Sequence, residues 1–243
     1  MIKKILLRMI DLYVSPLKWK NKVALQAKNI FVDNLEHYYS FFDIASRLPV
    51  NENGIIVDVG AFNGATTIIF SKQFPGRKVI GFEPHPSSFE VALKKCAPYP
   101  DITLFPYALD NEKGEKDFYV SDNGLSSSLN SSLENISFRV NGKIKVKVST
   151  LDDMLASEGK ILFIKLDTQG RELNILKGAE TLKKTKFILT EMNNHQIYDN
   201  ACQYYEVDEF LRKQNFKLYN LTSGFNYNGI TEYDALYKNM SAD

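Results

Sequence analysis

The sequence predicts an α/β fold in which helices cover both faces of a mostly parallel, doubly wound sheet. Short, continuous runs of β-branched and aliphatic residues recur along the chain, as at 55–59 and 161–166. A helical segment follows each of these runs, a pattern typical of parallel strands buried on both faces. Apolar residues make up 44% of the 243 residues, enough for one substantial core with elaborations.

The chain is expected to comprise an N-terminal helical extension, residues 1–48, and one α/β domain, residues 49–243. Apolar residues from Ile2 to Leu17 recur at helical spacing among lysines and arginines, which predicts an amphipathic helix within residues 1–22. This helix either packs on its own domain or a second subunit, or lies on a membrane surface with Trp19 at the interface. We favour packing, because an apolar helical stripe usually marks a buried surface. No run is long enough to cross a bilayer, and no signal-peptide core forms.

The elements of the α/β domain follow in order after an aromatic-rich helix at 24–48, which Pro49 ends. The alternation of apolar runs and helical patterns predicts strands at 55–59, 78–82, 102–107, 161–166 and 187–190. It also predicts intervening helices at 65–73, 87–95 and 171–182. A helix at 206–213 and strands at 216–220 and 234–238 then predict an antiparallel closing pair.

Between the third and fourth of these strands the pattern changes. Residues 116–121 and 143–149 alternate polar and apolar side chains, and Asn141-Gly142 predicts a tight turn before the second run. We therefore expect an inserted antiparallel β excursion. The serine-rich segment 121–135 lies within it, either as a solvated loop or as a lid over the strand ends, and its position favours the lid.

Charge and cysteine content narrow the class of protein. The 30 basic and 29 acidic side chains give a net charge of +1, which argues against a nucleic-acid partner. The two cysteines, Cys96 and Cys202, lie far apart without metal-type spacing, so a reducing compartment and a cytoplasmic location are expected. His85 and His195 form no recognised metal signature with the carboxylates, and no metal is predicted.

The stretch IIVDVGAFNGATTIIF, residues 55–70, carries the first site motif, Asp58-x-Gly60-x-x-x-Gly64. A nicotinamide site would instead show G-x-G-x-x-G after the first strand. The Asp58 carboxylate precedes the glycines, where it would accept hydrogen bonds from an ammonium group or the backbone and would repel a pyrophosphate. Gly60 permits an unusual backbone conformation, and Gly64 allows the next helix to start close to a ligand.

A second acidic residue, Glu83, ends the second strand some twenty residues beyond the glycine turn, and Pro84 follows it. An acidic side chain at this position accepts ribose hydroxyls of a nucleoside cofactor, although a surface salt bridge is the alternative. Adenine is expected near Tyr107 and Ala108, with the Ala108 backbone bonding the ring, unless both are ordinary packing residues. Together with Asp58, these features predict a site for S-adenosylmethionine.

The chain resembles the FkbM family of S-adenosylmethionine-dependent methyltransferases over about residues 50–220. The stretches that carry the resemblance are VDVGAFNG (57–64), GFEPHP (81–86), GLSSSL (124–129), VSTLDDML (148–155), FIKLDTQGRELNILKGAE (163–180) and FILTEMN (187–193). The resemblance implies a Rossmann-like class I methyltransferase fold and methylation of small-molecule or glycan hydroxyls. Phe62 departs from the asparagine that the family often has there.

Catalytic candidates lie at the ends of the fourth and fifth strands. Asp167 is the first, as a base or an orienting group for the acceptor hydroxyl, and a helix cap before Arg171 is its alternative. Glu191 is the second, positioning the acceptor, and His195 is a candidate proton shuttle or a solvated loop residue. Lys165, on the sheet face opposite Leu166, is expected to pair with a strand-end carboxylate.

The function predicted is O-methylation of a hydroxyl on a sugar, glycan or glycan precursor. Three alternatives are open: methylation of a polyketide-like secondary metabolite, a nicotinamide-dependent sugar oxidoreductase, and a non-catalytic subunit that retains the fold. A glycan or small-molecule acceptor is therefore the expected partner. A homo-oligomer and peripheral contact of residues 1–22 with the inner face of the membrane are further expectations.

Overall fold

The computed structural model describes residues 52–121, 127–131, 140–194, 198–221, 225–227 and 230–241. The helices predicted within 1–22 and 24–48, and the domain boundary at residue 48, lie outside the described residues. None of the helices described is both long enough and apolar enough to cross a membrane.

Within the described ranges the main sheet has eight strands, in the order β10-β11-β8-β7-β1-β2-β3, with β9 also paired to β11. The five strands from β8 to β3 run parallel, and β11 runs antiparallel to β8. This confirms the prediction of a mostly parallel sheet with an antiparallel closing strand. The bounds are β1 (Ile55–Val59), β2 (Val79–Phe82), β3 (Ile102–Phe105), β7 (Ile161–Leu166), β8 (Thr185–Asn193), β9 (Phe216–Leu221), β10 (Phe225–Tyr227) and β11 (Ile230–Asn239).

The strand order reverses between β1 and β7, since β2 and β3 follow on one side and β8 on the other. Ligands of doubly wound folds bind beyond the carboxyl ends of the strands at such a reversal. The ends of β1 and β7, at Val59 and Leu166, are directly paired. The fold therefore places a ligand site where the motifs containing Asp58 and Asp167 meet.

The inserted β excursion forms a separate three-stranded sheet of order β4-β6-β5. Its strands are β4 (Ala108–Leu109), β5 (Gly114–Ser121) and β6 (Val140–Ser149), and β5 and β6 are antiparallel as predicted. The turn predicted at Asn141-Gly142 is wrong, because both residues lie inside β6 and Gly142 pairs with Val120. The register shifts beside this pair, between Val120 and Ser121, so the asparagine-glycine sequence marks an irregularity and not the end of the strand.

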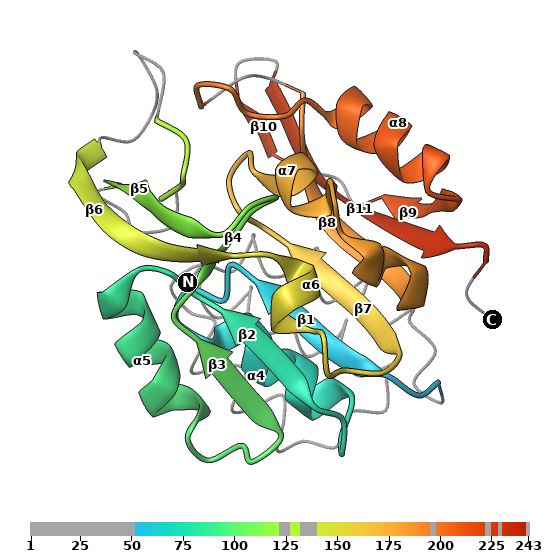
Figure 1. Ribbon diagram of the computed structural model, residues 1–243, viewed down its shortest axis with the longest axis horizontal. Coiled ribbons are helices and arrows are strands. Elements are labelled where there is room, and N and C mark those ends of the chain that lie inside the picture. The colour runs from blue at the N-terminus through green and yellow to red at the C-terminus, as the bar shows by residue number, and fades with distance from the viewer. Residues whose placement is uncertain are drawn as a thin grey trace, which may run out of the picture. The chain divides into compact units, whose positions relative to one another are not determined.

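In the part of the chain that the structure describes, six helical segments connect the strands. Of these, α7 and α8 lie in front of the main sheet in Figure 1 and α4 lies behind it. The helix predicted at 171–182 is instead two short segments, interrupted where Gly178 takes the left-handed φ of 86°. His85 caps the helix predicted to begin at Ser87, its ring accepting a hydrogen bond from the Ser88 amide at 3.4 Å. The bounds are α4 (Ala65–Gln73), α5 (Pro86–Cys96), α6 (Leu151–Met154), α7 (Glu172–Leu176), the 3-10 helix η2 (Glu180–Lys184) and α8 (Tyr204–Lys213).

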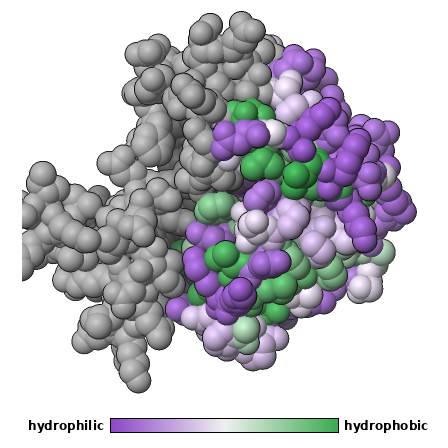
Figure 2. Space-filling model, turned by 90° about the vertical axis from the view of Figure 1, so that its left-hand side faces the viewer, coloured by the Kyte–Doolittle hydropathy of each residue, from purple (hydrophilic) through white to green (hydrophobic). Residues whose placement is uncertain are grey.

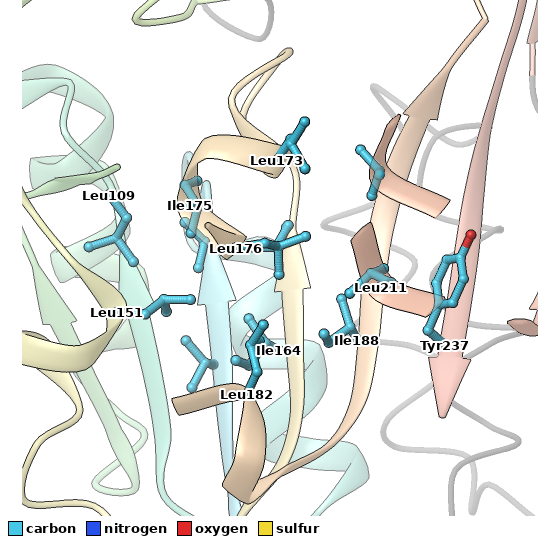
Figure 3. Packing of buried hydrophobic residues seen from close by; sticks show 14 of the residues in the cluster. Leu109, Leu151, Ile164, Leu173, Ile175, Leu176, Leu182, Ile188, Leu211 and Tyr237 are labelled. Atoms are coloured by element: carbon cyan, nitrogen blue, oxygen red, sulfur yellow. The ribbon is translucent and has the colours of Figure 1, made fainter. Parts of the chain in front are cut away.

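Alternate residues of the parallel strands bury opposite faces of the sheet. On one face, Ile164 and Ile188 form a buried cluster with Leu176 of α7, Leu211 of α8 and Tyr237 of β11 (Figure 3). On the other face, the ring of Phe163 meets that of Phe70 from α4 edge-on, with centroids 4.8 Å apart. Because side chains alternate along a strand, Lys165 shares the α4 face with Phe163.

Among the described residues, surface hydrophobic side chains are distributed over several elements. On the face drawn in Figure 2, hydrophilic residues surround smaller groups of hydrophobic ones. Val91 and Leu93 are exposed on α5, and Tyr205 is exposed on α8. Scattered apolar side chains are normal on a protein surface, so these residues alone assign no interaction site.

Candidate functional site

The glycine turn after β1 depends on close packing against the rest of the protein. Gly60 has φ +83°, and a Cβ there would lie 2.0 Å from the carbonyl oxygen of Asp167. Gly64 has φ +78°, and a Cβ would lie 2.9 Å from the Cys96 sulfur and 3.2 Å from the Ala92 Cα in α5. Both positions therefore require glycine. The space beside the Gly64 Cα is filled by α5, and contact of Gly64 with the cofactor stays a prediction.

Phe62 adopts a left-handed backbone conformation at the centre of this turn, with φ 47°. Such a conformation costs an L-residue about 1–2 kcal/mol, and asparagine tolerates it better than a bulky side chain does. The Phe62 amide donates a hydrogen bond to Glu83 Oε2 at 2.8 Å, while Glu83 Oε1 accepts one from the His85 amide at 2.8 Å. Glu83 thus fixes the turns that follow β1 and β2 relative to each other.

Glu83 also has the acceptor chemistry that a ribose requires. Its side chain is almost fully buried, and this burial raises its pKa to about 7 although both amide hydrogen bonds favour the charged form. A carboxylate oxygen has two acceptor sites, so each can accept a ribose hydroxyl in addition to its amide. The structure therefore places Glu83 at the end of β2, beside the glycine turn, in a form that fits the ribose of a nucleoside.

Asp58 lies completely inside the protein, in a cluster with Lys165 and Asp167. Thr67 donates to Asp58 Oδ2 at 2.6 Å, and Lys165 Nζ lies 3.1 Å from Asp58 Oδ1 and 3.3 Å from Asp167 Oδ2. Lys165 also donates to the Gly60 carbonyl at 3.1 Å. Burial raises the pKa of Asp58, and Lys165 opposes this effect. Asp58 therefore acts on the glycine turn through Lys165, and its direct contact with a cofactor stays a prediction.

Lys165 is a buried cation compensated from two sides, as its expected pairing with a strand-end carboxylate requires. Burial by itself would lower the pKa of Lys165, but the carboxylates of Asp58 and Asp167 raise it above its usual range. Removing one member of such a buried set leaves a charge without compensation, which is strongly destabilising. The lysine therefore holds the ends of β1 and β7 together.

The structure brings the two candidate catalytic carboxylates together through a residue that the sequence did not single out. The Gln169 side-chain amide donates to Asp167 Oδ1 at 3.1 Å and to Glu191 Oε2 at 3.0 Å. The Tyr198 hydroxyl donates to Gln169 Oε1 at 2.7 Å. His195 lies outside the described residues, and its role as a proton shuttle stays a prediction.

Asp167 is not the helix cap that was its alternative interpretation. The N-cap of α7 is Arg171, which makes no capping bond through its side chain. Glu172 closes the preceding turn instead, with Oε1 accepting from the Thr168 amide at 2.7 Å and Oε2 from the Gly170 amide at 3.0 Å. The Asp167 carboxylate is therefore directed to Lys165 and Gln169.

The described part of the serine-rich segment, residues 127–131, lies against the same turn. Ser128 Oγ donates to the Gln169 carbonyl at 2.8 Å, and Asn130 Nδ2 donates to the Gly170 carbonyl at 3.2 Å. The Asp199 amide donates to the Ser131 carbonyl at 2.7 Å. These contacts place residues 127–131 at the carboxyl end of β7, and the role of the segment as a lid stays a prediction.

Arg171 connects this segment to the inserted sheet. Its guanidinium forms an ion pair with the fully buried carboxylate of Asp110 and donates to Asn130 Oδ1 at 3.3 Å. Lys116 lies 2.8 Å from the same Asp110 oxygen. Although burial alone would raise the pKa of Asp110, these hydrogen bonds and charges lower it. The turn after β7, the serine-rich segment and the inserted sheet therefore share one hydrogen-bonded network.

The remaining predicted cofactor residues lie near the ends of β2 and β3. Pro84 directly follows Glu83 and is half-buried. Ala108 is buried and pairs with Val148 in the small sheet, and Tyr107 packs partly against the main core. Their roles at the ribose and adenine stay predictions. Among the described residues, no group of three histidine, cysteine or acidic side chains is arranged to hold a metal ion.

The sequence model of the FkbM methyltransferase domain matches residues 58–218. The chain belongs to the FkbM methyltransferase family. Membership confirms the resemblance that the motifs indicate and, with it, S-adenosylmethionine as the cofactor, and it excludes the nicotinamide-dependent oxidoreductase. Glu83 and the glycine turn fit the nucleoside part of that cofactor.

Two relatives support the family assignment, and two solved structures support the fold. The 2-O-methyltransferase NoeI of Sinorhizobium fredii is 30% identical over 159 residues, 60% of this FkbM chain and 65% of the relative. The hexuronic acid methyltransferase AglP of Haloferax volcanii is 26% identical over 71% of this chain and 73% of its own. A putative O-methyltransferase of Klebsiella pneumoniae, 11% identical, superposes with a TM-score of 0.54 over 98% of this chain and 100% of its own. TrmK of M. capricolum, 9% identical, superposes with a TM-score of 0.51 over 83% of this chain and 68% of its own. These superpositions confirm the Rossmann-like class I methyltransferase fold.

Proposed function

We propose that this protein is an S-adenosylmethionine-dependent O-methyltransferase that acts on a hydroxyl of a sugar, in a glycan or a glycan precursor. The observation that carries this proposal is the pairing of Asp167 and Glu191 through Gln169 at the carboxyl ends of adjacent parallel strands. The glycine turn and Glu83 lie at the ends of the next strands of the same sheet. A relative named as a hexuronic acid methyltransferase supports a sugar as the acceptor.

In this proposal, some residues of the site bind the cofactor and others take part in proton transfer. When bound, the cofactor supplies a methyl group on a positively charged sulfur. Glu83 accepts the ribose hydroxyls, and the glycine turn carries the backbone close to the nucleoside. Asp167 and Glu191 orient the acceptor hydroxyl and accept its proton, a contribution that is typically about 10²–10⁴-fold in rate. Correct positioning of the hydroxyl adds to this acceleration.

The experiment that tests this function measures release of S-adenosylhomocysteine from S-adenosylmethionine with a panel of acceptors. The panel contains hexuronic acids, neutral hexoses and a polyketide-like alcohol. We expect turnover with a sugar, and a loss of about 10²-fold or more in kcat for Asp167→Asn and Glu191→Gln. Glu209→Gln, a matched change at an exposed position of α8, should leave kcat unchanged.

The outcomes of this experiment are distinct. Turnover only with the polyketide-like alcohol would move the function to secondary-metabolite methylation. Calorimetric binding of S-adenosylhomocysteine without turnover on any acceptor would indicate a non-catalytic subunit. Normal turnover in both Asp167→Asn and Glu191→Gln would refute the assignment of the catalytic carboxylates.

The proposal includes a cytoplasmic location. It also includes contact of residues 1–22 either with a second copy of the chain or with the inner face of the membrane. Deleting residues 1–22 tests both contacts. Unchanged pelleting with anionic liposomes would refute the membrane contact, and an unchanged mass in analytical ultracentrifugation would refute the subunit contact.

A further inference from the structure

Gln169 occupies a backbone conformation that glutamine rarely adopts. Its φ is 57°, in the left-handed region, at a cost of about 1–2 kcal/mol for an L-residue. Neighbours on both sides fix this conformation: Ser128 donates to the Gln169 carbonyl at 2.8 Å, and Glu172 accepts from the Gly170 amide at 3.0 Å. Backbone strain of this kind persists where surrounding contacts determine it, and it is concentrated at functional sites.

The side chain of Gln169 uses all of its polar atoms within the site. Its Nε2 donates one hydrogen bond to Asp167 Oδ1, at an N–O distance of 3.1 Å, and one to Glu191 Oε2, at 3.0 Å. Its Oε1 accepts the hydroxyl hydrogen of Tyr198 at 2.7 Å. Because a carboxylate accepts and does not donate, these partners fix which end of the amide carries nitrogen. Tyr198 therefore sets the orientation in which Gln169 reaches both acids.

We propose that Gln169 is a positioning residue for methyl transfer, which holds Asp167 and Glu191 at a fixed separation and stabilises both as carboxylates. This inference rests on the proposed function, because it assigns to Gln169 the arrangement of the groups that accept the acceptor's proton. Gln169 acts through the two acids and need not touch the acceptor itself.

The electrostatic reason is that two carboxylates hydrogen-bonded to one nitrogen lie close enough to repel each other. Such repulsion raises the pKa of one member of a pair, which then keeps its proton near neutral pH and no longer serves as a base. Two N–H donors from one amide favour the charged forms and oppose this effect. The other titratable groups of the described elements around the pair are Asp58 of β1, Lys165 of β7, Glu172 of α7, Asp234 of β11 and Tyr198.

The first test uses Gln169→Asn, because asparagine keeps an amide and tolerates the left-handed backbone but is one methylene too short to bridge both acids. We expect its thermal stability and its affinity for S-adenosylhomocysteine to match the wild type. We expect kcat to fall by about tenfold or more, and the acidic limb of the kcat–pH profile to move upward by about one unit or more. Tyr198→Phe should show a smaller loss of kcat with a shift in the same direction.

A second test needs no acceptor and measures the free energy of unfolding against pH. Gln169→Glu adds a third acid beside the two, so in the folded state this acid would have a pKa above its unfolded value. The folded protein then binds more protons than the unfolded one, and the free energy of unfolding falls relative to wild type as the pH rises from 5 to 8. Gln214→Glu makes the same chemical change at an exposed position after α8 and should show no such trend.

The outcomes separate this inference from the proposed function. Wild-type protein that releases no S-adenosylhomocysteine with any acceptor would refute the function, and this inference with it. If the wild type is active, an unchanged kcat–pH profile in Gln169→Asn refutes the positioning role alone. A Gln169→Glu protein whose relative stability does not change with pH also overturns the inference, because the third acid would then not meet the other two.

Discussion

Glu83 should make cofactor affinity depend on pH in the physiological range. Its pKa is raised to about 7 by burial, and its protonated form would present a donor where the ribose hydroxyls and the Phe62 amide need an acceptor. If only the carboxylate form binds, the Kd for adenosine or S-adenosylhomocysteine should rise about tenfold between pH 8 and pH 6, or about 1.4 kcal/mol. Affinity is therefore highest above pH 7 and is lost as the pH falls through the pKa.

Isothermal titration calorimetry at pH 6, 7 and 8 and constant ionic strength would measure this effect. Adenosine lacks the amino-acid part of the cofactor, so a matching trend for both ligands assigns it to the nucleoside end. Glu83→Gln should bind more weakly at pH 8 and lose most of the pH dependence. His85→Asn controls for the neighbouring histidine, since asparagine also caps helices, and it should keep the wild-type trend.

A constant Kd from pH 6 to pH 8, or an unchanged pH dependence in Glu83→Gln, would refute this reasoning. The same raised pKa has an opposite consequence for folding. Because folded Glu83 binds its proton more tightly than the unfolded chain does, its contribution to the free energy of unfolding decreases as the pH rises from about 4.5 to about 7. As the pH rises toward 7, the contribution of Glu83 to the free energy of unfolding should therefore decrease, while the affinity of the protein for the cofactor should increase.

Three further predictions concern the buried cation, the glycine turn and metal ions. Lys165→Met should lower the free energy of unfolding in urea by about 3–5 kcal/mol, because the fully buried carboxylate of Asp58 and the partly buried one of Asp167 lose their cation. Exposed Lys183→Met should cost less than about 1 kcal/mol, and similar costs for the two variants would contradict the buried cluster. Gly60→Ala should abolish soluble expression, since its Cβ would meet a carbonyl oxygen at 2.0 Å. The control Gly76→Ala, with φ +78° and nothing within 4 Å of its Cβ, should lower the free energy of unfolding by only about 1–2 kcal/mol. Equal expression and stability of the two variants would refute the steric argument. Dialysis against EDTA should leave methyl transfer unchanged, and a loss restored by magnesium would contradict the prediction of no metal.

The parallel sheet could be predicted because its signals are local. The strands at Ile55–Val59 and Ile161–Leu166 and the helix at Ala65–Gln73 have the predicted bounds, since each is a short apolar run limited by glycine, proline or polar residues. The excursion was predicted with one error at Asn141-Gly142. A type I′ turn and an irregular strand both favour this dipeptide, and only the pairing with β5 distinguishes them.

The site was predicted in part, because its acidic residues stand at or near the carboxyl ends of strands and its supporting residues do not. The ends of strands made Glu83, Asp167 and Glu191 recognisable in the sequence. Gln169 and Tyr198 lie in loops, 29 residues apart, and only the folded chain brings the tyrosine hydroxyl to the amide. The available signal was Gly170 just before a helix, because a glycine there favours a turn with positive φ. In the structure both Gln169 and Gly170 have positive φ.

The position of β11 inside the main sheet has a consequence for biosynthesis. This strand follows all other described strands along the chain, yet it lies inside the sheet, paired with β8 on one side and with β9 and β10 on the other. A nascent or prematurely terminated chain that lacks residues 230–239 leaves the edge of β8, beside Glu191, without its neighbour, and such an edge invites aggregation. Translation products that lack β11 should therefore be insoluble and not partially active.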